Sequence, residues 1–157
     1  MTTGTAAGHP GPAAVTLPRA IRDAIVDHAR AGEPNEACGL IVGDRPAADG
    51  GRALRWEPAH NAAASRYLYE IDSADLLRIS IAVDDADQVI WAIVHSHTHT
   101  HAVPSPTDVR QALYPDALYL LVSLAPEEAD PATGAESLRA WRIVDGTVWE
   151  VGLSLEG

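Results

Sequence analysis

Four of the chain's seven histidines fall between residues 95 and 101, and a carboxylate follows soon after them. His95 and His97 stand two residues apart at the end of an apolar run, residues 89–94. Because alternate side chains of a strand point to the same face, both imidazoles could share one metal ion. Asp108 would complete a set of three ligands, which leaves tetrahedral zinc one position for water. Zinc lowers the pKa of a bound water toward neutrality, so this pattern is typical of a zinc hydrolase.

The segment Ser105-Pro106-Thr107-Asp108 also has a purely structural interpretation, as the start of a helix. Ser105 would be the N-cap, Pro106 would occupy the first helical position, and Asp108 would reach back to the N-cap backbone in a capping box. Ser105 could combine capping with a chemical role. The carboxylate of Asp108 would bind either a metal or the backbone, and the residues alone leave both interpretations open.

A hydrolase of this kind also needs a general base, and Glu36, just before the apolar residues 37–42, is the candidate. A solvated loop carboxylate is the alternative interpretation of Glu36.

His99 and His101 continue the alternating spacing, but the residues up to Pro104 favour a loop. We therefore expect neither of these two histidines to be a primary ligand. The remaining histidines have no partners in the sequence and are expected to be surface or hydrogen-bonded residues: His9, His28 and His60.

The composition limits the possible partners. The net charge is -11 and every basic residue is an arginine, which argues against nucleic acid and against anionic membrane surfaces as partners. Cys38 is the single cysteine, so an internal disulfide and a multi-cysteine zinc site are both excluded. This favours a cytoplasmic protein, with Cys38 as a buried core residue. No apolar run approaches the ~20 residues that span a bilayer.

The 157 residues predict one domain at residues 15–157, preceded by a disordered tail at residues 1–14. Helices are expected at residues 18–30, 73–86 (with Ser73 as the cap) and 105–114. Strands are expected at residues 37–42, 54–58, 66–71, 88–95, 118–124, 138–144 and 147–155. Strands and helices alternate early and the chain ends in a hairpin. This order predicts an α/β fold, a three-layer sandwich with a mixed sheet flanked by helices.

Taken together, Glu36, the His95-x-His97 pair, Ser105 and Asp108 resemble the complete catalytic signature of the JAMM (MPN-plus) metallopeptidases. Each position agrees with the family in residue type and in spacing. The resemblance covers roughly residues 15–155, and further segments look like their family counterparts: residues 34–40, 61–72, 115–119 and 141–146.

The resemblance implies a cytidine-deaminase-like fold and a zinc ion held by His95, His97 and Asp108. It implies that Glu36 acts as general base and then general acid. It also implies that Ser105 donates a hydrogen bond to the developing oxyanion.

Within the family, His-Ser-His-Thr followed by Pro-Ser-Pro-Thr-Asp is similar to the actinobacterial Mec-type branch, although His99 and His101 depart from it. That branch releases cysteine from a small ubiquitin-like sulfur-carrier protein during cysteine biosynthesis. The implied substrate is therefore the amide bond after the carrier's Gly-Gly tail. The alternatives are processing of another carrier, removal of a ubiquitin-like modifier, a non-catalytic MPN scaffold, and a metal-buffering protein that uses the histidine loop. The complete ligand set argues against the scaffold. The sequence leaves the oligomeric state open, and a homodimer is among the possibilities.

Overall fold

The computed structural model describes residues 12–157, in which seven strands form a single mixed sheet in the order β1-β7-β6-β5-β4-β2-β3. Strand pairs β1–β7 and β4–β5 are parallel and the other pairs are antiparallel. The strands are β1 (Ala14–Pro18), β2 (Cys38–Gly43), β3 (Ala53–Ala59), β4 (Val89–His97), β5 (Leu118–Ser123), β6 (Ser137–Val144) and β7 (Thr147–Glu156).

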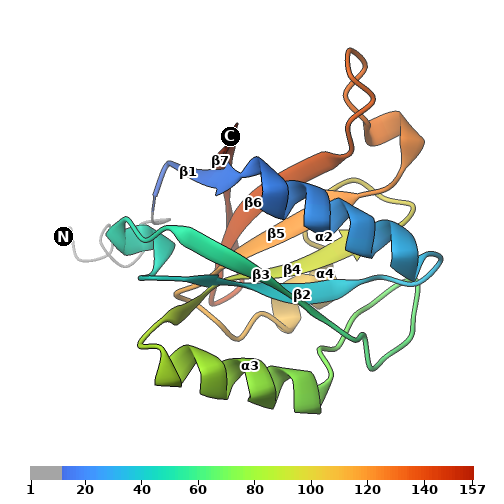
Figure 1. The fold of residues 1–157 in the computed structure, drawn as a ribbon. Helices are drawn as coiled ribbons and strands as arrows, with labels where there is room; N and C mark the ends of the chain where they lie inside the picture. The colour runs from blue at the N-terminus through green and yellow to red at the C-terminus, as the bar shows by residue number, and fades with distance from the viewer. Residues whose placement is uncertain (1–11) are drawn as a thin grey trace.

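Two long helices cover opposite sides of this sheet (Figure 1), and a short third helix lies beside the end of β4. Helix α2 (Arg19–Gly32) packs on one core cluster through residues such as Ile25, and helix α3 (Ser73–Asp85) packs on the other through Ile79. Helix α4 (Pro106–Arg110) follows β4 in the chain. The α/β sandwich with a mixed sheet that the sequence predicts is confirmed. None of the helices in the described part of the chain has the length and hydropathy that a membrane crossing requires.

Strand β4 carries the candidate ligands to one end of the sheet. Its residues alternate between the two cores, with Val94 in the cluster under α2 and Ile93 in the cluster under α3. Alternate side chains of a strand point to the same face, so those of His95 and His97 lie on the same face of the sheet as that of Ile93. The crossover from β4 to its parallel neighbour β5 contains α4. The carboxyl ends of such parallel strands are where α/β proteins commonly bind ligands.

Several element predictions are corrected by the structure. Residues 66–71 do not form a strand. The segment has only an isolated bridge between Asn61 and Ile71, because hydrogen bonds to the side chain of Asn61 take the place of backbone hydrogen bonds to a partner strand.

The start and end of two helices also differ from the prediction. Asp72, and not Ser73, is the N-cap of α3, since its carboxylate accepts a hydrogen bond from the Asp75 amide. Helix α4 ends at Arg110 instead of residue 114.

The N-terminal strand was not expected from the sequence. Strand β1 begins at Ala14, the last residue of the expected tail, and buries Leu17 completely against the α2 side of the sheet. Residues 1–11 of that expected tail, and His9 with them, lie outside the described residues.

Gly39 in β2 has no room for a side chain, so Gly39→Ala is expected to destabilise the protein. A Cβ atom there would lie 2.7 Å from the carbonyl oxygen of Glu57 and would clash with the ring of Trp56. We expect overpacking to lower the free energy of unfolding by about 1–3 kcal/mol, measured by urea denaturation. Gly152→Ala is the control, because its Cβ would lie 3.3 Å from the Cβ of Ala14. An equal loss in both variants would contradict the explanation.

Candidate metal centre

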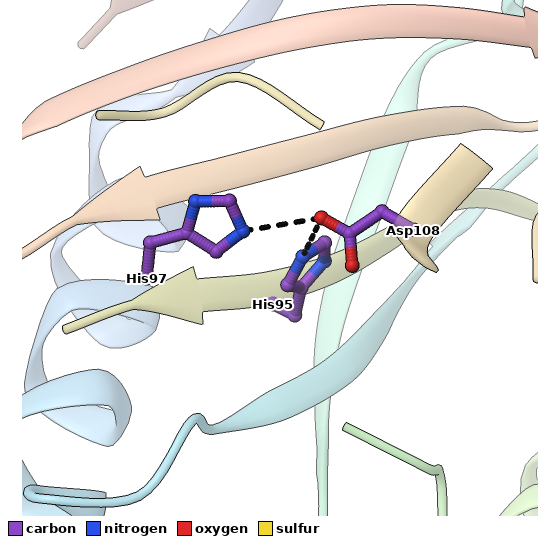
Figure 2. Close-up of side chains that lie close together, drawn as sticks. All are labelled: His95, His97 and Asp108. Carbon is purple, nitrogen blue, oxygen red and sulfur yellow. Dashed lines mark hydrogen bonds and ion pairs between the residues drawn. The ribbon is translucent and has the colours of Figure 1, made fainter. Parts of the chain in front are cut away.

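Three buried side chains converge at the end of β4. His95 and His97 come from the strand and Asp108 from the first turn of α4, and both rings point toward the carboxylate (Figure 2). Oδ2 of Asp108 lies 3.2 Å from Nε2 of His95 and 3.1 Å from Nε2 of His97. One ligand atom from each residue lies within 4.8 Å of the others, and within residues 12–157 this is the one group of its kind. The arrangement can hold a metal ion.

The capping box of α4 aims the carboxylate of Asp108. The Asp108 amide donates to Oγ of Ser105 over 3.1 Å, and the Ser105 amide donates to Oδ2 of Asp108 over 2.9 Å. Pro106 occupies the first helical position. The oxygen that caps the helix is therefore the same oxygen that faces both imidazoles. Capping and metal ligation are compatible here, although the sequence presents them as competing. Oγ of Ser105 accepts the capping hydrogen bond, so its own proton stays free to be donated.

The charges of the three groups depend on one another. Burial alone would raise the pKa of Asp108, but the imidazoles of His95 and His97, whose Nε2 atoms lie 3.2 Å and 3.1 Å from Oδ2, hold it well below its usual range. Burial lowers the pKa of His95 despite the nearby carboxylate. Burial also opposes protonation of His97, but its contacts with Asp108 and the His101 carbonyl outweigh burial and raise its pKa. An ionised carboxylate and a neutral imidazole are the forms that bind a divalent metal. A cation at this point would take the place of the His97 proton.

The hydrogen bonding of the two histidines tests whether the residues fit a metal. Nδ1 of His97 donates to the backbone carbonyl of His101 over 2.8 Å, so loss of the proton that Nε2 shares with Asp108 would leave the Nε2 lone pair directed at the carboxylate. Both ring nitrogens of His95 are buried without a hydrogen-bond partner. An unsatisfied buried polar group costs about 1–3 kcal/mol. A divalent ion bound by both Nε2 atoms and the carboxylate would remove this cost at Nε2, so the donor set fits a metal.

Glu36 lies two residues before the start of β2 and is 5% exposed. Its Oε1 atom is buried without a hydrogen-bond partner. Burial raises the pKa of Glu36 to about 8; the positive charge of His97 opposes this rise and the negative charge of Asp108 adds to it. The Ser96 hydroxyl, between the two histidines, accepts a 2.8 Å hydrogen bond from the Ala37 amide. This contact fastens the segment that carries Glu36 to the strand that carries the histidines.

The other histidines lie outside this group. His99 and His101 are exposed, and the contribution of His101 is its backbone carbonyl. Nε2 of His28 lies within 3.2 Å of two strand carbonyl oxygens, and His60 pairs with Asp75 over 2.8 Å.

Cys38 is buried, and burial raises the pKa of its thiol to about 12. The thiol is therefore protonated at neutral pH and unsuited to nucleophilic chemistry.

Sequence patterns did not reveal Tyr69, which contacts the group directly. Its ring stacks on the ring of His95 with a centroid distance of 4.2 Å and an interplanar angle of 20°. Tyr69 lies in an irregular segment 26 residues before His95 in the chain, so no spacing rule connects the two residues.

The chain is similar to several known proteins. A family model described as "Prokaryotic homologs of the JAB domain" matches residues 18–144. The chain is 45% identical over 132 residues to the CysO-cysteine peptidase of Mycobacterium tuberculosis, and the match covers 82% of this chain and 82% of that protein. It is 36% identical over 107 residues to the desampylase of Haloferax volcanii, covering 65% of this chain and 75% of that protein.

Two solved structures share the fold. Protein DSY2949 from Desulfitobacterium hafniense has a TM-score of 0.75 and 29% identity, covering 90% of this chain and 92% of that one. AF2198, a JAB1/MPN domain protein from Archaeoglobus fulgidus, has a TM-score of 0.54 over 89% of this chain and 99% of that one. At 14% identity, AF2198 is evidence for the fold alone.

Proposed function

Because the chain belongs to the family of prokaryotic JAB-domain homologues, we propose that it is a zinc-dependent peptidase acting on a small ubiquitin-like sulfur-carrier protein. The scissile bond is the amide that joins cysteine to the Gly-Gly tail of the carrier, and the released cysteine serves cysteine biosynthesis. The observation that carries the proposal is the buried group of His95, His97 and Asp108 beside Glu36. We place the reaction in the cytoplasm, which the single cysteine of the chain supports.

We assign the metal to Nε2 of His95, Nε2 of His97 and the carboxylate of Asp108. Two imidazoles and one carboxylate are a known ligand set of catalytic zinc with an open position. Bound there, zinc would polarise the scissile carbonyl and make a water molecule acidic enough to attack it. The hydrogen bond from His97 to the His101 carbonyl fixes the tautomer that ligation requires.

Glu36 and Ser105 supply the proton transfer and the oxyanion contact in this proposal. The positive charge of bound zinc would lower the raised pKa of Glu36, and its carboxylate then takes a proton from the attacking water and later delivers it to the leaving amine. The Ser105 hydroxyl donates its free proton to the oxygen of the scissile carbonyl as negative charge develops there. Neither residue is a ligand, so both roles can be separated from metal binding by substitution.

We propose that the carrier tail reaches the site past Tyr69. The ring of Tyr69 stacks on His95, and Tyr69 also lines a cavity of about 480 Å³. Ile71, Arg110 and Tyr114 line the same cavity. A Gly-Gly tail suits such a path, since only glycine lets the backbone approach walls and metal closely. The tail would enter extended, as peptides do when they bind beside strands.

The leaving group is tested by comparing two tails on one carrier protein. The first substrate ends in Gly-Gly-Cys, and the second has Gly-Gly joined to a lysine side chain of another protein. Intact mass spectrometry is expected to show rapid loss of one cysteine from the first substrate and slower cleavage of the second. Cleavage of the second substrate alone would overturn cysteine release. It would support removal of a ubiquitin-like modifier, the second candidate function, which the similarity to the desampylase favours.

Ser105→Ala is expected to lower kcat by about 10²–10³-fold with little change in KM, because the lost donor acts on the oxyanion. Helix stability should also fall by about 1 kcal/mol through the lost N-cap. Steady-state kinetics with the Gly-Gly-Cys substrate and thermal unfolding measure the two effects. Ser73→Ala is the control, because Ser73 begins α3 without capping it. A change in KM alone would reduce Ser105 to a helix cap.

A further inference from the structure

The two histidines of the metal centre are held in different ways. His97 is oriented by a hydrogen bond from its second ring nitrogen, Nδ1, to the His101 carbonyl. Metal-ligating histidines usually have such a partner, because it fixes the ring orientation. Nδ1 of His95 has no hydrogen-bond partner, and its Nε2 has only the 3.2 Å approach to Oδ2 of Asp108. Something other than a hydrogen bond from the second ring nitrogen must therefore hold the ring of His95 in place.

We infer that Tyr69 is a positioning residue whose ring holds the imidazole of His95 with Nε2 directed at the metal position. The two rings are nearly parallel, at 20°, with centroids 4.2 Å apart. A face-to-face contact of this kind blocks rotation of the imidazole about its Cβ–Cγ bond, because a rotated ring would collide with the tyrosine. Stacked aromatic pairs also add about 0.5–1.5 kcal/mol beyond their buried area. The inference rests on the proposed metal site.

Tyr69 belongs to an irregular segment, and the side-chain amide of Asn61 fixes that segment. Nδ2 of Asn61 donates to the Leu68 carbonyl over 3.1 Å, and Oδ1 accepts from the Glu70 amide over 2.9 Å. These contacts fasten the residues on both sides of Tyr69. Nδ2 also donates to the backbone carbonyl of Glu36 over 2.9 Å. One amide thus ties the Tyr69 segment to the backbone of the proposed general base.

The ring of Tyr69, and not its hydroxyl, performs this role. The contact with His95 is between ring faces. Phenylalanine would keep that face, whereas leucine would keep apolar volume and lose it. Tyr67 provides a matched control, because it is a tyrosine of the same segment with a side chain that is 78% exposed.

The test loads wild-type protein, Tyr69→Leu, Tyr69→Phe and Tyr67→Leu with cobalt(II). Competition with a chromophoric chelator gives the affinity, and the visible absorption of the bound cobalt reports the ligand geometry. We expect Tyr69→Leu to weaken cobalt binding by about 10–100-fold, the usual cost of losing a residue that orients a ligand. Its absorption spectrum should also change. Tyr69→Phe and Tyr67→Leu should match the wild type in both measurements.

Two results would overturn the inference. The first is wild-type affinity and spectrum in Tyr69→Leu. The second is an equal loss of cobalt affinity in Tyr69→Phe, which would show that the hydroxyl of Tyr69, and not its ring, supports metal binding. Thermal unfolding of the metal-free variants checks their fold. If Tyr69→Leu does not fold, Tyr69→Met takes its place with the same expectations, because methionine adapts to irregular space without a flat ring. Wild-type protein that binds no cobalt would instead overturn the metal site itself, together with this inference.

Discussion

Glu36→Gln is expected to lower kcat by about 10²–10⁴-fold while the metal stays bound, since general acid–base catalysis contributes a factor of that size. Glutamine has nearly the same shape as glutamate but cannot carry the proton from water to the leaving amine. The buried Oε1 atom of Glu36 has no hydrogen-bond partner in the metal-free protein, so the substitution breaks no existing contact of that oxygen. Steady-state kinetics with the Gly-Gly-Cys substrate and zinc content by elemental analysis measure the two quantities.

Glu33→Gln is the control for this variant, because Glu33 lies three residues earlier with a side chain that is 43% exposed. It should leave both turnover and zinc content unchanged. Loss of zinc from Glu36→Gln would make Glu36 a ligand and contradict its assignment as the base. Unchanged turnover would exclude any role for Glu36 in the chemistry.

His97→Ala is expected to remove zinc from the protein and activity with it. Zinc binding is worth about 10–16 kcal/mol in four-ligand structural sites, which is about 3 kcal/mol per ligand. Losing one of three protein ligands should therefore weaken binding by about two to three orders of magnitude. The substitution also removes the partner that helps to hold the pKa of Asp108 low. Competition with a chelator measures the affinity, and kinetics at saturating zinc measure the remaining activity.

His99→Ala and His101→Ala are matched controls, because both side chains are exposed in the same loop and lie outside the ligand group. The contact that His101 makes with His97 uses the backbone carbonyl, which alanine keeps. Both controls should retain zinc and activity. Stoichiometric zinc and full activity in His97→Ala would exclude His97 as a ligand. Loss of zinc from His99→Ala would place the metal in the loop instead.

The strand that carries the histidines could be predicted because its signal is local. Residues 89–94 are apolar, and the alternation of a strand then places His95 and His97 on one face. The capping box is local too, since Ser105 and Asp108 are three residues apart. The fold class followed from the order of such local patterns. Glu36 was a candidate from its position before an apolar run, and resemblance to a family linked it to the histidines, because 59 residues separate it from His95 in the chain.

The features that the sequence did not reveal depend on contacts between distant segments. Alternating Tyr67, Tyr69 and Ile71 suggested a strand, but the side chain of Asn61 takes the hydrogen bonds that a partner strand would supply. The stack of Tyr69 on His95 has no sequence signal for the same reason. Strand β1 is short, and its parallel pairing with β7 joins residues near opposite ends of the chain. A short segment of this kind gains its strand conformation from the sheet and not from its own composition.

In the proposed function, zinc at His95, His97 and Asp108 is required to cleave a Gly-Gly-Cys tail. The most direct test strips the purified protein with a chelator and then returns zinc in steps while intact mass follows the carrier. We expect no cleavage by the stripped protein and full recovery at one zinc per chain, with loss of one cysteine from the carrier. Cleavage that persists at full rate without metal would contradict the requirement for zinc.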